Sequence, residues 1–130
     1  MKLNVKMKIA GLWVAVMFMY IYVDFIARFM PGNIEEAIAG KMGPFPVTQV
    51  ALLAAMILMT IPSVMVFLSL TLKAKANRWT NIIVGTLHIV LAIVNVIGMS
   101  WAFYIFATIV EVVLLSLIVW YAWKWPQQEA

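Results

Sequence analysis

The stretch that decides the fold is residues 79–124, WTNIIVGTLHIVLAIVNVIGMSWAFYIFATIVEVVLLSLIVWYAWK. It contains no proline, and a single helix of this length would be more than twice as long as the ~30 Å hydrocarbon layer of a membrane is thick. The stretch must therefore turn back on itself, and GMSW at 98–101 is the place that suits a turn. We expect two antiparallel membrane helices, residues 79–98 and 101–124.

The overall composition is that of a membrane protein. Of the 130 residues, 66% are hydrophobic and 11% are charged, whereas a soluble domain is usually about 45–50% apolar and ~25% charged. This length holds about four spans of ~20 residues with short connections, so we expect a single transmembrane domain over residues 1–130. The chain has no cysteine, which removes disulfides, thiolate metal sites and thiol catalysis. No interleaving of basic and aromatic residues indicates a nucleic-acid surface.

Two further apolar runs, residues 9–29 and 47–72, precede the predicted hairpin. We expect the first to be an anchored helix and not a cleaved signal peptide, because the run is long and no small-residue cleavage site follows it. Pro62 interrupts the second run and should kink it, and Thr60 and Ser63 are placed to bond the carbonyl that Pro62 frees. The predicted fold class is therefore all-α, a polytopic membrane protein with four transmembrane helices in an up-down bundle.

The lysines and arginines give this bundle a direction. Seven of the nine fall on one side of a four-span threading: Lys2, Lys6, Lys8, Lys73, Lys75, Arg78 and Lys124. Arg28 and Lys41 are alone on the other side. By the positive-inside rule, both termini are expected in the cytoplasm. The imbalance also argues against a dual-topology antiparallel dimer of the small multidrug transporter kind, which needs nearly balanced loops.

Residues 31–46 form the longest connection, on the predicted outer side. Asn33 followed by Glu36 resembles a capping box that opens a short amphipathic helix. Two interpretations of this loop are open. The helix lies on the bundle or on the lipid headgroups, or it acts as a lid over an outward-facing cavity.

A few polar side chains fall inside the predicted spans, where a charged group costs roughly 2.5–3.5 kcal/mol and usually faces the bundle interior. His88 and Glu111 are each between eleven and twelve residues from the centre of the predicted turn. They should therefore sit level with each other, roughly 17 Å below the outer surface. Asn95 and Tyr104 match in the same way, nearer the outside.

These residues belong to two predicted helix faces of small and polar side chains. One face carries Asn81, Gly85, His88, Ala92, Asn95 and Met99, and the other carries Tyr104, Thr108, Glu111 and Leu115. Matched depths on neighbouring helices indicate contact, and we expect a His88–Glu111 pair. Such a pair could simply tie two helices together, because polar contacts in membrane bundles are worth only about 0.6–2 kcal/mol. Glu111 could also be protonated and donate a hydrogen bond.

Asp24, in the first span, lies about level with Asn95. One interpretation is an i,i+4 ion pair with Arg28. The other is a cavity whose floor is formed by His88 and Glu111 and whose polar mouth is formed by Asp24, Asn95, Tyr104 and Gln49. The predicted ligand-binding residues are Asp24, His88, Asn95, Tyr104, Thr108 and Glu111.

Several chemistries are poorly supported by these residues. One histidine and two acids at different depths do not make a metal-ligand set, and one histidine cannot supply bis-histidine haem ligation within a single chain. The sequence shows no nucleophile elbow, P-loop or zinc-binding helix. We therefore predict no catalytic residues, no metal and no cofactor, and consider an enzyme the less favoured class.

Four segments together resemble a known family: WVAVMFMYIYVDF in the first span, PGNIEEAIAGKMGPFPVTQ in the outer loop, LSLTLKAKANRWTNI after the second span and VWYAWKWP at the end. This family consists of small bacterial four-helix membrane proteins classed only as a domain of unknown function. The resemblance covers nearly the whole chain and implies a bacterial inner-membrane protein, but no activity. The size and span count are also similar to the broad DoxX-like group, with which no specific motif matches.

Three functions from different classes follow. The first is a protein that binds a small amphipathic or lipid-like ligand, for example a quinone or a lipid, which enters from the outer leaflet and hydrogen-bonds to Glu111 and His88. The second is a proton-coupled small transporter or channel, which would act as an oligomer because four short helices enclose little volume. The third is a structural accessory subunit of a larger membrane complex. The lipid bilayer is an expected partner in each case, and nucleic acid in none.

Overall fold

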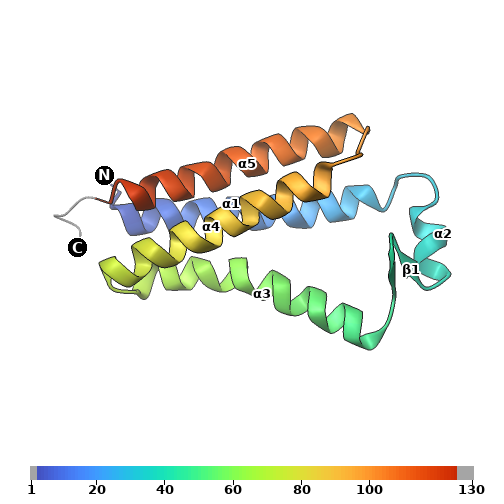
Figure 1. Ribbon diagram of the computed structural model, residues 1–130, viewed down its shortest axis with the longest axis horizontal. Helices are drawn as coiled ribbons and strands as arrows, with labels where there is room; N and C mark the ends of the chain where they lie inside the picture. Colours follow the sequence, from blue (N-terminus) through green and yellow to red (C-terminus); the bar gives the residue numbers. More distant parts are fainter. Residues whose placement is uncertain (1–2, 126–130) are drawn as a thin grey trace.

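The fold, seen in a computed structural model that describes residues 3–125, is built on four long helices (Figure 1). These are α1 (Val5–Ala27), α3 (Gln49–Thr71), α4 (Ala74–Val96) and α5 (Ala102–Trp123). Between α1 and α3 lie the short helix α2 (Asn33–Ile38) and the two-residue strands β1 (Lys41–Met42) and β2 (Phe45–Pro46). Each long helix is apolar and long enough to cross a membrane, which confirms the all-α, four-span fold class.

The turn between α4 and α5 lies where the sequence predicts it. Gly98 occupies this turn with φ 82°, in the left-handed region that glycine enters without a steric penalty. At its other end, α4 begins at Ala74 and not at residue 79. Hydropathy marks where a helix enters the hydrocarbon layer, whereas the helix itself continues through the basic residues that precede this point.

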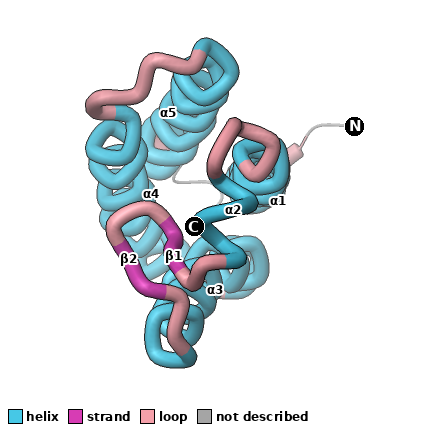
Figure 2. Tube along the Cα trace, turned by 90° about the vertical axis from the view of Figure 1, so that its right-hand side faces the viewer, coloured by secondary structure: helices cyan, strands magenta, loops and turns pink. Residues whose placement is uncertain are grey.

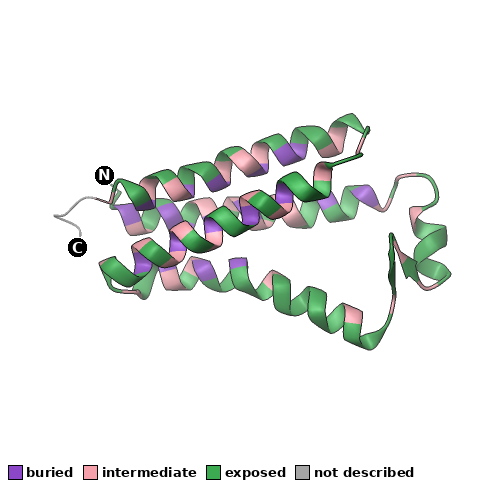
Figure 3. Cartoon of the chain, viewed as in Figure 1, coloured by how far each residue is buried: buried purple, intermediate pink, exposed green. Residues whose placement is uncertain are grey.

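The four long helices form an up-down bundle, seen end-on in Figure 2. Helix α1 packs against α3 and α5, and α5 packs against α4, while α3 and α4 make far fewer contacts with each other. These two helices are joined by the short link Leu72–Lys73 and diverge from it toward the opposite end (Figure 1). The buried residues of α3 are therefore confined to its second half, at Pro62, Met65 and Ser69 (Figure 3).

Near the link, a network of buried hydrogen bonds joins α1, α3 and α4. The Trp13 indole N–H donates to Asn81 Oδ1 at 2.7 Å, and the Asn81 amide donates to Asn77 Oδ1 at 2.7 Å. The Asn77 amide in turn donates to the Ser69 carbonyl at 2.8 Å, and the Ser69 hydroxyl donates to Asn81 Oδ1 at 3.3 Å. Because all four side chains are fully buried and each finds a partner, the network closes this end of the bundle.

The contact between α4 and α5 depends on Gly85. A β-carbon at this position would lie 2.8 Å from Val119 Cγ2 and 3.6 Å from Ile118 Cγ2, so only glycine permits this approach without movement of a neighbour. Arg78 holds the same end of the hairpin, because its guanidinium donates to the carbonyls of Ala122 and Trp123 at 3.1 and 3.2 Å. A cation at a helix C-terminus also complements the helix dipole.

The connection over residues 31–46, called the outer loop after its predicted side of the membrane, contains a hairpin that its sequence does not predict. Lys41 pairs with Pro46 and Met42 pairs with Phe45, and the turn begins at Gly43 with φ 61°. Glycine is favoured at the first central position of one type of two-residue hairpin turn for this reason. The hairpin crosses the end of the bundle where α3 and α4 diverge (Figure 2).

The predicted capping box is wrong, although the short helix α2 is present. The N-cap of α2 is Gly32, and no side chain caps the helix. The Asn33 amide instead donates to the carbonyl of Ala27 at 2.6 Å. The last carbonyls of a helix lack intrahelical donors. Asn33 therefore caps the C-terminal end of α1 and ties the loop that follows to this helix.

The expected hydrogen bonds around Pro62 are also wrong. The Thr60 hydroxyl donates to the Met56 carbonyl at 2.8 Å, and the Ser63 hydroxyl donates to the Met59 carbonyl at 2.9 Å. Serine and threonine within a helix reach the carbonyl four residues before them. Proline has no backbone N–H, so the carbonyl that lacks its helical donor is that of Leu58. Neither hydroxyl bonds to it.

Replacing Asn81 with leucine should lower the stability of the bundle. The substitution leaves the Trp13 indole N–H and Asn77 Oδ1 buried without partners, a loss of about 1–3 kcal/mol. The measurement is thermal unfolding of the purified protein in one detergent, with Asn95→Leu as the control because Asn95 is an exposed asparagine of the same helix. Equal unfolding temperatures for the two variants would contradict the structural role of the network.

The cytoplasmic placement of both termini stays a prediction, and the absence of natural cysteine makes it easy to test. Position 35 in α2 and position 75 in α4 are both exposed and lie at opposite ends of the bundle. A membrane-impermeant maleimide should label Glu35→Cys in intact cells. It should label Lys75→Cys only after the cells are permeabilised. The reverse pattern would show that the charge bias does not set the orientation.

Candidate functional site

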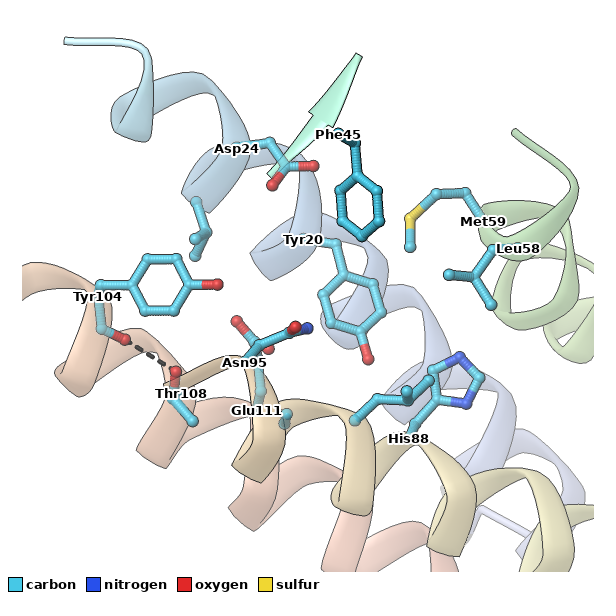
Figure 4. A pocket seen from close by; sticks show the side chains of 13 residues that line it. Tyr20, Asp24, Phe45, Leu58, Met59, His88, Asn95, Tyr104, Thr108 and Glu111 are labelled. Atoms are coloured by element: carbon cyan, nitrogen blue, oxygen red, sulfur yellow. Dashed lines mark hydrogen bonds between the residues drawn. The ribbon is translucent and has the colours of Figure 1, made fainter. Parts of the chain in front are cut away.

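A cavity of about 330 Å³ lies among the four long helices at the end where α3 and α4 diverge (Figure 4). It is lined by residues of α1, α3, α4 and α5 and by Phe45 of β2. All six predicted ligand-binding residues line it: Asp24, His88, Asn95, Tyr104, Thr108 and Glu111. The structure thus brings these six side chains together, and their binding of a ligand stays a prediction.

The cavity has the mouth and floor that the helix depths suggest. Asp24 and Asn95 are exposed, whereas Glu111 is 7% exposed and His88 is 2% exposed. Phe45 reaches the cavity from the hairpin (Figure 4), so the outer loop covers it at least in part. Of the residues expected at the mouth, Gln49 is the one that does not line the cavity.

Glu111 is the most unusual of the lining residues. Its side chain is buried on α5 and is directed into the cavity, between Tyr104 and Tyr20 (Figure 4). Within residues 3–125, its carboxyl group forms no hydrogen bond and no ion pair. A polar group in this position usually has a partner, so the missing partner sets Glu111 apart from the satisfied asparagines near the link.

The predicted direct pair between His88 and Glu111 is wrong. His88 Nδ1 lies 2.9 Å from the carbonyl of Val84, and the ring packs edge-on against Trp13 and parallel to Tyr20, with centroid distances of 5.7 and 6.2 Å. These contacts turn the imidazole toward α1. The two residues therefore share a cavity without bonding each other.

The hydrogen bond to Val84 identifies the tautomer of His88. A carbonyl only accepts, so Nδ1 carries a proton, and in the neutral imidazole Nε2 is then an acceptor. This Nε2 is the buried side-chain nitrogen or oxygen atom without a hydrogen-bond partner in the described part of the chain. His88 Nε2 and the Glu111 carboxyl group, which both lack a hydrogen-bond partner among the described residues, belong to residues that line the cavity.

The alternative ion pair between Asp24 and Arg28 is not formed. Arg28 Nε donates instead to the backbone carbonyl of Asp24, at 3.4 Å. The Asp24 carboxylate lies at the cavity beside Phe45 (Figure 4). Arg28 lines a separate, smaller cavity of about 230 Å³ under the outer loop, and Tyr104 borders both cavities.

Two lining residues qualify the predicted set. The Thr108 hydroxyl donates to the carbonyl of Tyr104 at 2.9 Å, so it lines the cavity with its donor already engaged. Tyr20 was not predicted as a site residue, although it lies four positions before Asp24 on the same face of α1. That spacing was the available signal for Tyr20.

Within residues 3–125, no three histidine, aspartate and glutamate side chains gather closely enough to hold a metal ion.

The stability of a Glu111→Gln variant separates a structural role from a functional one. Because Glu111 has no partner, its replacement by the neutral isostere glutamine should leave the free energy of unfolding unchanged or raise it by up to about 2 kcal/mol. The unfolding temperature should accordingly stay the same or rise. Thermal unfolding in the same detergent measures this, with Asn81→Leu as the destabilised reference. A fall as large as that of Asn81→Leu would mean that the carboxyl group serves the fold.

Comparisons with known proteins place the chain in a family without assigning an activity. No curated protein and no solved structure matches it. Residues 2–130 match the sequence model of DUF6326, which is described as a family of unknown function. This confirms the resemblance to an uncharacterised family, while the bacterial origin and the likeness to the DoxX-like group stay predictions. The chain therefore belongs to DUF6326, a family of unknown function whose member described here has four long apolar helices.

Proposed function

We propose that the protein binds a small amphipathic or lipid-like molecule in the cavity between its four helices. The observation that carries this proposal is the Glu111 carboxyl group, which is 7% exposed, faces the cavity and has no partner within the described residues. A ligand with a polar group beside Glu111 would supply that partner.

The contrast with the rest of the bundle supports this proposal. Near the link, the buried side chains of Asn77 and Asn81 are bonded to one another, to Trp13 and to Ser69. The protein therefore satisfies its buried polar groups where only stability is required. A local departure from this rule is expected at functional sites.

The remaining cavity wall suits an apolar part of the ligand. Leu58 and Met59 come from α3, and Leu91 and Ala92 come from α4. The volume of about 330 Å³ lies at the lower end of the range of ligand pockets. Because α3 and α4 diverge at this end, a tail could extend between them toward the lipid.

The setting we propose is the bacterial inner membrane, with both termini in the cytoplasm and the cavity toward the outer leaflet. Six of the basic residues at the link end are within the described range, and Arg28 and Lys41 are at the cavity end, as the positive-inside rule requires for this orientation. The size and span count, similar to those of the DoxX-like group, support the same setting. A quinone and a lipid both remain candidates for the ligand.

A proton-coupled transporter or channel is the second candidate, because the carboxylates of Asp24 and Glu111 lie at two depths of one cavity. Below Glu111, however, the buried residues of α5 are Leu115, Ile118 and Ala122. This segment of α5 is apolar, and the buried polar side chains of α3 and α4 near the link, Ser69, Asn77 and Asn81, are bonded to one another and do not titrate, which favours binding over transport. If Glu111→Gln abolished a proton-dependent flux and left ligand binding intact, transport would be the function. An accessory role would require co-purification with a larger complex.

Filling the cavity tests the proposed function. Ala92 is buried and lines the cavity, so Ala92→Trp should displace a ligand, whereas Leu87→Trp places the same ring on an exposed position of the same helix. We expect native mass spectrometry of gently extracted protein to find a bound molecule in the wild type and in Leu87→Trp, and to find it lost from Ala92→Trp. The same bound species in all three proteins would contradict a ligand in the cavity.

A further inference from the structure

We propose that the polar group of the ligand is a cation, so that the protein binds an amphipathic amine whose ammonium group lies at the Glu111 carboxylate and passes Asp24 on its way in. This inference rests on the proposed function and narrows its class of ligand. It is carried by the charges, the free acceptors and the aromatic rings of the cavity.

The charges around the cavity are of one sign. Asp24 and Glu111 line it, and no lysine or arginine does. Arg28, the nearest cation along α1, is bonded to the Asp24 backbone carbonyl and borders the smaller cavity. Within residues 3–125, neither carboxylate has an ion-pair partner. In a low-dielectric site, a cationic ligand is the complement of such a pair.

The side chains of Tyr20, Tyr104 and Asn95 bring hydrogen-bond donors to the cavity, whereas the carboxylates of Asp24 and Glu111 bring acceptors. An ionised carboxylate offers only acceptors. His88 Nε2 is also an acceptor in the tautomer fixed by Val84, but it is buried and the ring is turned toward α1. The Thr108 hydroxyl, which could have donated, is bonded to the Tyr104 carbonyl. An ammonium group brings three donors and no acceptor, which suits the Glu111 carboxylate.

Aromatic rings stand on both sides of the carboxylate. Tyr20 and Tyr104 flank Glu111, and Phe45 lies at the mouth beside Asp24 (Figure 4). The faces of such rings attract cations, more strongly where water is excluded. The hydrophobic side chains of Leu58, Met59 and Leu91 then suit the tail of the same molecule.

Other amphipathic ligands fit these groups less well. A fatty acid would place a third carboxylate beside Asp24 and Glu111. A quinone presents only carbonyl acceptors, so the hydroxyls of Tyr20 and Tyr104 could donate to it, but an ionised Glu111 would be left without a donor. An alkyl alcohol offers one donor and no charge. The amine alone among these compensates the buried negative charge.

The test compares four probes with similar tails: dodecylamine, dodecanol, dodecanoate and a decyl-substituted quinone. Each is titrated at neutral pH into the intact protein in phosphatidylcholine nanodiscs, and binding is followed by the shift in unfolding temperature. Dodecylamine should stabilise the wild type most. Glu111→Gln should weaken its apparent affinity by about tenfold, as expected for the loss of one charge-assisted hydrogen bond. Asp24→Asn should weaken it by less, because it removes a negative charge of the cavity that the bound ammonium group does not contact.

Glu35→Gln is the matched control, because it removes one negative charge from the exposed helix α2, away from the cavity. It should leave dodecylamine binding unchanged. Asp24→Asn alters an exposed side chain and guards against a Glu111→Gln protein that fails to fold. If dodecylamine affects wild type, Glu35→Gln, Asp24→Asn and Glu111→Gln equally, its binding is non-specific partitioning and the inference is overturned.

Failure of this inference is distinguishable from failure of the proposed function. If dodecanol, dodecanoate or the quinone stabilises the wild type more than dodecylamine does, and Ala92→Trp removes that effect, the cavity binds an amphiphile that is not a cation. The inference then fails and the proposed function stands. If no probe distinguishes the wild type from Ala92→Trp, both fail.

Discussion

The hydrogen bond from the Trp13 indole to Asn81, 2.7 Å long and fully buried, is the interaction on which the shape of the bundle depends. Through Asn77 and Ser69 it holds α1, α3 and α4 together beside the short link. A two-residue link and a closed network at one end allow α3 and α4 to separate only at the other. The cavity lies at that other end because this one is sealed.

The two ends of the bundle treat polar side chains in opposite ways. In lipid, a buried polar group must find its partner within the protein, and the asparagines beside the link do so. At the cavity, Glu111 and His88 Nε2 do not. The same helices supply both ends, so composition and propensity do not explain the difference. A ligand that binds in the cavity and supplies the missing hydrogen-bond partners would explain this difference.

Much of the candidate site was predictable because a membrane limits how helices can be arranged. The turn at Gly98 and the spacing along α4 and α5 are enough to place His88 level with Glu111 and Asn95 level with Tyr104, on facing sides of a hairpin. All of them line the cavity. The contact of His88 could not be predicted in this way, because depth and helix face do not say toward which neighbour a ring turns. Its packing against Trp13 and Tyr20 required the position of α1.

The sequence by itself determined four membrane-length helices, their alternating directions, and the inward faces of α4 and α5, because periodicity and hydrophobic length are properties of each segment alone. Only the tertiary structure decided that α1 packs between α3 and α5, that Asn33 serves the end of α1 and not α2, and that Phe45 reaches the cavity. In each case several helices or side chains of similar hydrophobicity and helix propensity could have made the contact. They are made by the fit of particular side chains, such as Val119 against the bare backbone of Gly85, and such a fit exists only once the helices are together.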